Sequence, residues 1–189
     1  AGHNDKGLHG CICGGQDVER GVANEDCPLL HEATGGHVGG VTCLDVSRTG
    51  KLLVTGGTDR TVRVWKREGR SSRYMLWKQS SPEYASARKV TSVSIHGRRI
   101  ASGSADGTVK VWAPTGRGAG LSCQQTLSCD SSVLSIDWHE NRIVAGCYDG
   151  TIKVFDAQSG DRLSTVRCDN AVRSVAYSPD GTKLVAGVD

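Results

Sequence analysis

Three cysteines and one histidine near the start of the chain are of the residue types that bind zinc. Cys11 and Cys13 are separated by one residue, and Cys27 and His31 follow in the same stretch. This spacing fits none of the common zinc-finger patterns. Cys11 and Cys13 also fall where an apolar strand is expected, and cysteine packs there as a small hydrophobic residue. We therefore predict no metal ligands among them; zinc binding by the four residues is the alternative.

The usual sequence motifs of catalytic sites do not occur in the chain. It contains no phosphate-binding loop of the Gly-x4-Gly-Lys-Ser/Thr type, no His-Glu-x2-His pair and no Gly-x-Ser-x-Gly turn. The glycine pairs 14–15 and 56–57 stand at the ends of expected strands, and we interpret them as turn residues. The sequence therefore predicts a protein that is not an enzyme and that carries no cofactor.

The composition favours a single core with many tight turns. The chain has 189 residues, of which 25 are glycine, and only 5% are aromatic. Its eight cysteines stand mostly within apolar strand patterns, and the chain is longer than typical disulfide-framed domains, so we predict reduced thiols. No apolar run reaches the length of a membrane span, and no signal peptide is visible. These features predict a cytoplasmic or nuclear protein that does not bind a membrane.

Basic residues are concentrated in one part of the chain. Residues 60–99 contain eleven lysines and arginines against two glutamates, a net charge of +9, whereas the rest of the chain carries −6. Such an asymmetry favours a docking patch for a partner of opposite charge, such as an acidic protein or RNA; an ordinary solvated rim is the alternative.

A short pattern that ends in an aspartate recurs along the chain. Clear copies occupy residues 53–59, 100–106 and 143–149, and a fainter copy occupies residues 11–17. The aspartates lie 42, 47 and 43 residues apart. Each clear copy is followed by a strand pattern with an aromatic residue at its end, which is Trp65, Trp112 or Phe155. A fixed period of this length indicates a repeat protein.

Each repeat predicts four strands and no helix. A segment in which apolar and polar residues alternate with period 2 leads each unit, at residues 41–46, 90–95, 133–138 and 172–177. The expected strands are 41–47, 51–57, 61–65 and 73–79, then 90–95, 99–103, 108–112 and 122–127, then 133–138, 142–146, 151–155 and 161–167. One such sheet cannot bury both of its faces, so successive sheets must stack.

These repeats resemble those of the WD-repeat β-propeller family. The resemblance rests on Gly36-His37, Asp59 and Trp65 and on the counterparts Asp106, Trp112, Asp149 and Phe155, and it covers about residues 35–189. It implies an all-β propeller fragment with four-stranded antiparallel blades and a ring that is not closed. The expected units are a degraded or partial blade at 1–34, blades at 35–80, 81–128 and 129–168, and the first half of a further blade at 169–189. We expect the missing blades to belong to the full-length chain.

In that family a histidine, a strand hydroxyl, the turn aspartate and the strand tryptophan form a buried hydrogen-bonded set. The matching residues here are His37, Thr55, Asp59 and Trp65. A buried carboxylate in a tight turn needs donors, which the imidazole and the hydroxyl provide. The set looks like a hydrolase triad, but the aspartate recurs in every repeat, so we interpret it as structural.

Later units depart from this pattern. Ser86, Cys129 and Cys168 stand where the first unit has His37, and we interpret the two cysteines, at equivalent positions of adjacent units, as small substitutes for histidine and not as metal ligands. Ser102 keeps the strand hydroxyl, whereas Ala145 lacks it and Phe155 cannot donate a hydrogen bond. We therefore expect the first unit to have the best-satisfied turn.

The family arrangement also divides the loops between two rims. The rim that most often holds peptides would present the candidate partner-binding residues Thr58, Lys89, Ala105, Asp130, Tyr148 and Asp169. Tyr148 is the best anchor candidate, because an exposed aromatic side chain contributes much contact area at low entropy cost. The other rim would carry the candidate basic patch Lys66, Arg67, Arg70, Arg98 and Arg99. Few aromatic residues accompany this patch, so stacking on RNA bases is poorly supported.

The resemblance predicts a non-catalytic scaffold that binds one or more protein or peptide partners. One alternative is a substrate-recognition module of a ubiquitin ligase, because residues 99–103 resemble F-box-linked propellers, although an F-box and a Trp-Asp-x-Arg motif are both missing. A second alternative is an RNA-associated propeller that uses the basic 60–99 segment.

Overall fold

The computed structural model describes residues 36–67, 69, 74–80, 86–116 and 120–189, and these form strands and turns only. The first unit consists of β1 (Val41–Val46), β2 (Leu52–Gly57), β3 (Val62–Arg67) and β4 (Tyr74–Ser80). The second consists of β5 (Val90–His96), β6 (Arg99–Ser104), β7 (Thr108–Pro114) and β8 (Gly120–Ser128). The third consists of β9 (Val133–His139), β10 (Arg142–Cys147), β11 (Thr151–Asp156) and β12 (Arg162–Arg167). β13 (Val172–Tyr177) and β14 (Leu184–Val188) follow. The predicted blade at 1–34 lies outside the described residues.

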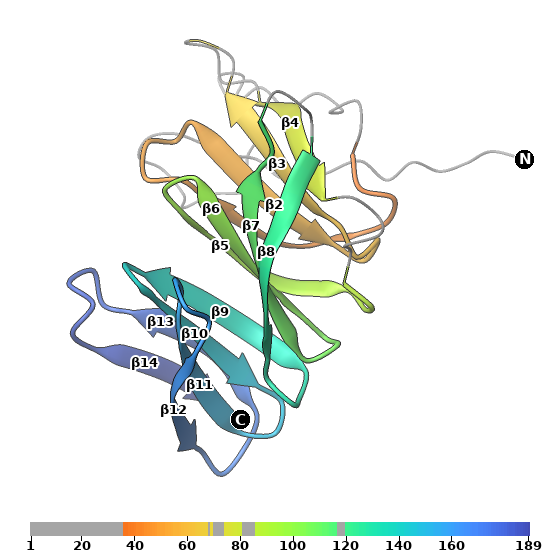
Figure 1. Ribbon diagram of the computed structural model, residues 1–189. Coiled ribbons are helices and arrows are strands. Elements are labelled where there is room, and N and C mark those ends of the chain that lie inside the picture. Colours follow the sequence, from red (N-terminus) through yellow and green to blue (C-terminus); the bar gives the residue numbers. More distant parts are fainter. Residues whose placement is uncertain (1–35, 68, 70–73, 81–85, 117–119) are drawn as a thin grey trace, which may run out of the picture.

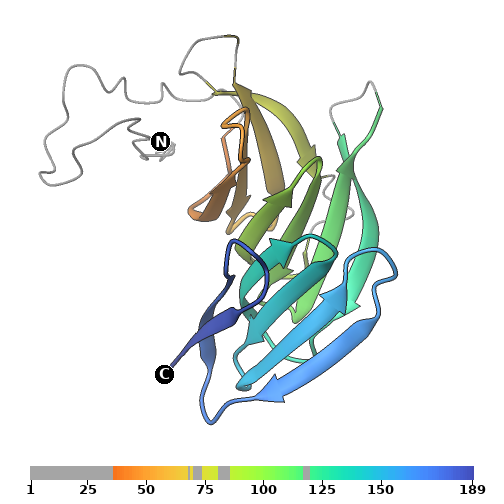
Figure 2. The ribbon, with the colours of Figure 1, turned by 90° about the vertical axis from the view of Figure 1, so that its left-hand side faces the viewer.

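The strands of each unit form an antiparallel sheet in chain order, and the units follow one another along an open arc (Figures 1 and 2). β13 and β14 make a two-stranded sheet at one end of the arc. The prediction of an all-β propeller fragment with four-stranded antiparallel blades is therefore confirmed. Each predicted strand is present, with ends within two residues of those expected.

One pairing was not predicted. The end of β4 pairs in parallel with the start of β8, through Gln79 with Gly120 and Ser80 with Leu121. The sheets of the first two units therefore join into one sheet of eight strands, in the order β1-β2-β3-β4-β8-β7-β6-β5. The ammonium group of Lys78 supports the junction, because its Nζ donates to the carbonyl oxygen of Thr115 at 2.7 Å.

The core lies between the units rather than within any one of them. Val54, Val62 and Val64 of the first unit pack against buried residues of β5, β6 and β7. A second apolar layer joins the second and third units, and a third layer joins the third unit to β13 and β14. Each sheet thus buries its faces only by stacking on its neighbours, as expected for a repeat protein.

Glycines in the second strand of each unit allow this close stacking. A Cβ atom at Gly103 would lie 2.7 Å from Cγ1 of Val133, and one at Gly146 would lie 2.7 Å from Cγ1 of Val172. Gly56 meets Val90 in the same way. The interpretation of Gly56 as a turn residue is therefore wrong, because this glycine pairs within β2 and makes room for the next unit.

Polar side chains of the first strands also tie neighbouring units together. The Thr91 hydroxyl donates to the carbonyl oxygen of Val133 at 2.7 Å, across the boundary between the second and third units. The carboxylate of Asp45 accepts from the backbone amide of Ile95 at 2.7 Å, and Asp137 accepts from Tyr177 in the same way. These bonds fix how each sheet is placed on the next, so the turns at both rims have defined positions.

Candidate functional site

The turn between β2 and β3 carries the hydrogen-bonded set expected from the sequence. Nδ1 of His37 lies 2.8 Å from Oδ1 of Asp59, and Nε2 of His37 lies 2.8 Å from Oγ1 of Thr55. The indole Nε1 of Trp65 donates to the same Thr55 oxygen at 2.9 Å. Thr55 is 0% exposed, so its hydroxyl cannot reach a substrate. The four residues come together as a buried structural network and not as a nucleophilic site.

The donors and acceptors of this network fit a neutral histidine. Thr55 accepts from Trp65, so its hydroxyl proton is available to Nε2 of His37, and Nδ1–H then donates to Asp59. Burial lowers the pKa of His37 below its ordinary value, despite the opposing effect of the Asp59 carboxylate. Burial alone would raise the pKa of Asp59, but hydrogen bonds from His37 and Thr61 outweigh it and lower that pKa.

These two shifts predict an acid-sensitive fold. The unfolded chain binds protons to His37 below about pH 6.5 and to Asp59 below about pH 3.8, whereas the folded chain resists both. The stabilisation is therefore present at higher pH and is lost as the pH falls. We expect a lower free energy of unfolding at pH 5 than at pH 7.5, measured by urea unfolding. In His37→Asn this difference should shrink; an unchanged difference would show that other groups cause it.

The later turns are less fully satisfied, as expected from the sequence. Asp106 accepts from the backbone amides of Ala87 and Thr108, at 2.7 Å and 2.9 Å, and from the Thr108 hydroxyl. Asp149 accepts from the amide and hydroxyl of Thr151, at 3.0 Å and 2.7 Å.

The tryptophan–hydroxyl bond survives in the second unit and is lost in the third. Trp112 donates through Nε1 to the hydroxyl of Ser102 at 2.8 Å. In the third unit Ala145 and Phe155 replace the acceptor and the donor together, and both are fully or nearly fully buried. Because the hydroxyl acceptor and the indole donor are replaced together, neither is left in the core without a hydrogen-bond partner.

The cysteine that replaces the turn histidine in the third unit has a different neighbour from the one expected. The thiols of Cys129 and Cys147 share a hydrogen bond, which together with burial raises the pKa of Cys129. Cys168 instead packs in the apolar layer next to β13 and β14. The neighbour that Cys129 contacts is therefore Cys147, in the second strand of the same unit, rather than the equivalent Cys168 of the next unit.

A cation in the third strand is a part of the turn that sequence reasoning missed. Arg63 is only 7% exposed; it donates to the carbonyl oxygen of Gly36 and contacts the Asp59 carboxylate. Lys153 stands at the matching position of the third unit, is also buried, and donates to the Cys129 carbonyl and the Asp130 carboxylate. The available signal was a Lys or Arg four residues after the aspartate in each copy of the repeat.

We call the loops that hold Asp59, Asp106 and Asp149 the aspartate rim. Val38 and Tyr148 are its most exposed large apolar side chains, at 82% and 62%. The other candidate partner-binding residues on this rim are Thr58, Lys89, Asp130 and Asp169, which are exposed, and Ala105, which is half-buried. The Asp130 carboxylate is not free, since it contacts Lys153 at 2.8 Å and Arg162 at 3.4 Å.

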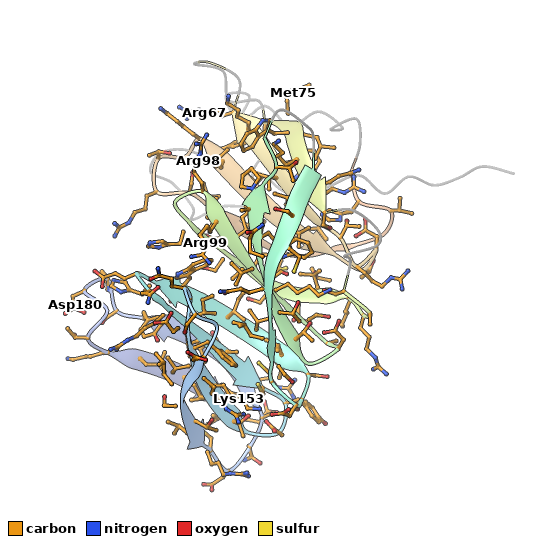
Figure 3. The ribbon with its side chains drawn as sticks, in the orientation of Figure 1. Arg67, Met75, Arg98, Arg99, Lys153 and Asp180 are labelled. Atoms are coloured by element: carbon orange, nitrogen blue, oxygen red, sulfur yellow. The ribbon has the colours of Figure 1, made fainter. Side chains whose placement is uncertain are left out.

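The turns 47–51, 97–98, 140–141 and 178–183 form the opposite rim. Of the candidate basic patch, Lys66, Arg67 and Arg98 are exposed there, and Arg70 lies outside the described residues. Arg99 is half-buried, because its guanidinium donates to the Ala157 carbonyl at 2.7 Å (Figure 3). The predicted basic segment is therefore divided: Arg63 and Lys78 are buried, and Arg88 and Lys89 lie on the aspartate rim.

Within the part of the chain that the structure describes, no group of three or more His, Cys, Asp or Glu side chains could hold a metal ion. The zinc alternative concerns Cys11, Cys13, Cys27 and His31, which lie outside that part. Nor do the described residues include a helix long and apolar enough to cross a bilayer.

Successive four-stranded sheets, stacked along an arc and held by repeated aspartate turns, define a β-propeller repeat protein. The family model described as "WD domain, G-beta repeat" matches residues 29–66, 80–113, 121–156 and 160–189. The chain therefore belongs to the WD-repeat family, as the sequence predicted.

Known proteins are similar to parts or most of this chain. Transducin beta-like protein 2 of Mus musculus is 46% identical over 52 residues, which is 24% of this chain and only 12% of that protein. The computationally designed protein Ika4 has 27% sequence identity and a TM-score of 0.67, over 82% of this chain and 88% of Ika4. The designed protein Ika8 gives the same identity and TM-score over 44% of its own length.

Proposed function

We propose that this chain is a non-catalytic scaffold whose aspartate rim binds a partner protein or peptide. WD repeats are generally protein-interaction scaffolds, which supports the coarse assignment. The finer assignment to this rim rests on Tyr148, which is 62% exposed. Its backbone amide donates to the Ser132 carbonyl at 2.9 Å, and the backbone amide of Asp149 donates to the Ser131 hydroxyl at 3.2 Å. These two bonds hold the backbone around Tyr148 in place. An exposed aromatic side chain on a fixed backbone contributes binding energy at a small entropic cost.

The test compares Tyr148→Ala with Leu163→Ala, a matched loss of an exposed apolar side chain on β12. Proteins captured by the wild-type chain are identified, produced in pure form and titrated against both variants. We expect Tyr148→Ala to weaken binding at least tenfold, with an unchanged melting temperature because the ring is exposed. Partners that tolerate Tyr148→Ala but are lost with Leu163→Ala would refute the assignment to this rim.

A substrate-recognition role in a ubiquitin ligase is a narrower form of this proposal. It adds the requirement that the captured partners include subunits of such a ligase. The same capture experiment therefore separates the general scaffold from the ligase module.

A further inference from the structure

A hollow of about 460 Å³ opens on the opposite rim, where turns of four successive units meet. Its lining comes from Ser47–Thr49, Ile95–Gly97, Trp138–Glu140 and Pro179–Asp180. This volume lies within the range of pockets that hold small ligands or several side chains of a peptide. The hollow is on the other side of the arc from the aspartate rim, so it would serve a second partner.

Side-chain contacts hold one wall of the hollow in place. The His96 ring stacks on the Trp138 ring, with centroids 5.6 Å apart and planes at 17°. The guanidinium of Arg99 lies 5.2 Å from the Trp138 ring centroid and is itself held by the Ala157 carbonyl. Nε1 of Trp138 donates to the Glu140 carbonyl at 2.8 Å. The wall is therefore preorganised, so its side chains lose little conformational entropy when an apolar group packs on it.

Positive charge gathers on one side of this hollow. Arg48 lines it, and Arg98 directly follows Gly97 of the lining. Arg67 lies beside the same turn as Arg48, because its backbone amide donates to the Lys51 carbonyl at 2.9 Å. Arg67 and Arg98 project from the same end of the large sheet in Figure 3. Among the described residues, Arg48, Lys51, Arg67 and Arg98 are exposed and form no salt bridge, so their charge is available to a partner.

Negative charge lines the far side. Glu140 and Asp180 belong to the third unit and to the turn between β13 and β14. The Ser178 hydroxyl and the amide and hydroxyl of Thr182 donate to Asp180, and they lower its pKa to about 2. This carboxylate is therefore ionised at neutral pH. Carboxylates of a partner would be attracted to the Arg48 side and repelled from the Asp180 side, which sets the direction of binding.

We propose that this hollow binds an acidic peptide segment of a partner protein. The carboxylates of the peptide lie over Arg48 and Arg98. An apolar or aromatic side chain of the peptide, next to these carboxylates, packs against Ile95 and the His96–Trp138 stack. RNA fits the site less well, because successive bases need several aromatic faces, whereas Trp138 is buried and His96 is the one exposed aromatic ring of this lining. The hollow also offers acidic groups, which would repel a continuous phosphate backbone.

The test uses the full chain and a fluorescein-labelled peptide in which a run of glutamates precedes one phenylalanine. Binding is followed by fluorescence anisotropy at low and at physiological salt. The first variant is Arg48→Glu with Arg98→Glu. Its matched control is Arg88→Glu with Arg167→Glu, which makes the same charge change at exposed residues away from the hollow. His96→Ala removes the exposed half of the aromatic stack, and melting temperatures show that each variant folds.

We expect the Arg48/Arg98 reversal to weaken the peptide at least tenfold and the control reversal to change it less than twofold. His96→Ala, or replacement of the phenylalanine by alanine, should weaken binding about fivefold, while added salt weakens it further. Equal loss in both charge reversals would mean that net charge alone attracts the peptide, and the site would be refuted. Tighter binding of a single-stranded RNA of equal charge, lost with the same Arg48/Arg98 reversal, would also overturn the proposal in favour of an RNA-binding rim.

Discussion

Asp59→Ala is expected to destabilise the fold more than the same substitution at Asp106 or Asp149. The Asp59 carboxylate accepts hydrogen bonds from the His37 imidazole and the Val38 amide in addition to those of its own turn. Its removal leaves the fully buried His37 side chain without this acceptor, whereas water can reach the Val38 amide, and we expect a cost of about 2–4 kcal/mol. The free energy of unfolding, measured in urea at pH 7.5, gives the size of the loss.

The three turns should form a graded series. Asp149→Ala is expected to cost only about 1 kcal/mol, because the carboxylate accepts from Thr151 within its own turn. Asp106→Ala should fall between the two. Asp161→Ala replaces an exposed aspartate outside these turns and should change stability by less than about 0.5 kcal/mol. Equal losses at Asp59 and Asp149 would show that the bonds to His37 and Val38 add nothing.

Gly103→Ala is expected to have a comparably large effect although it adds a single methyl group. The new Cβ atom would lie 2.7 Å from Cγ1 of Val133 and 3.0 Å from Cγ2 of Ile136, both of which belong to the next unit. Separating two sheets to relieve this overlap costs about 2–3 kcal/mol. Thermal unfolding followed by circular dichroism measures it.

A double-mutant cycle tests whether the overlap with Val133 causes the destabilisation expected in Gly103→Ala. Val133→Ala alone should destabilise the protein by about 2 kcal/mol, because the side chain is fully buried. In the double variant the smaller residue accepts the added methyl group, so the combined loss should be clearly less than the sum. Gly116→Ala is the control, since a Cβ atom there meets nothing within 4 Å. Additive losses would place the strain elsewhere.

Much of the fold was predictable because the same strand and turn patterns recur in each repeat. Alternating apolar residues located β1, β5 and β9, and the recurring aspartate located the turns between β2 and β3 and between β6 and β7. The network of His37, Thr55, Asp59 and Trp65 also formed as expected. Repetition makes such patterns reliable, because a chance match does not recur at a fixed spacing.

The features that sequence reasoning missed depend on where a residue lies in the assembled stack of sheets. The basic segment looked like one patch, yet Arg63 and Lys78 turn inward, while Arg67 remains outside. The first four residues of β3 are all buried between sheets and only its last two reach the rim, so charge that is close in sequence is divided between the core and the surface. The bonds of Thr91 and Asp45 to the next unit were missed for the same reason, since their acceptor and donor belong to another sheet.

The parallel pairing of β4 with β8 also affects how this molecule avoids unwanted association. Outer strands present unpaired amide and carbonyl groups that can recruit a strand from another molecule. Part of this hazard is removed where β4 and β8 satisfy each other, but β12 remains an outer strand with all six residues exposed. Arg162 and Arg167 stand at its two ends, so a second copy that aligned there would bring like charges together. Like charge at the ends of β12 thus opposes edge-to-edge pairing of the third sheet, whereas β4 and β8 of the first two units pair with each other.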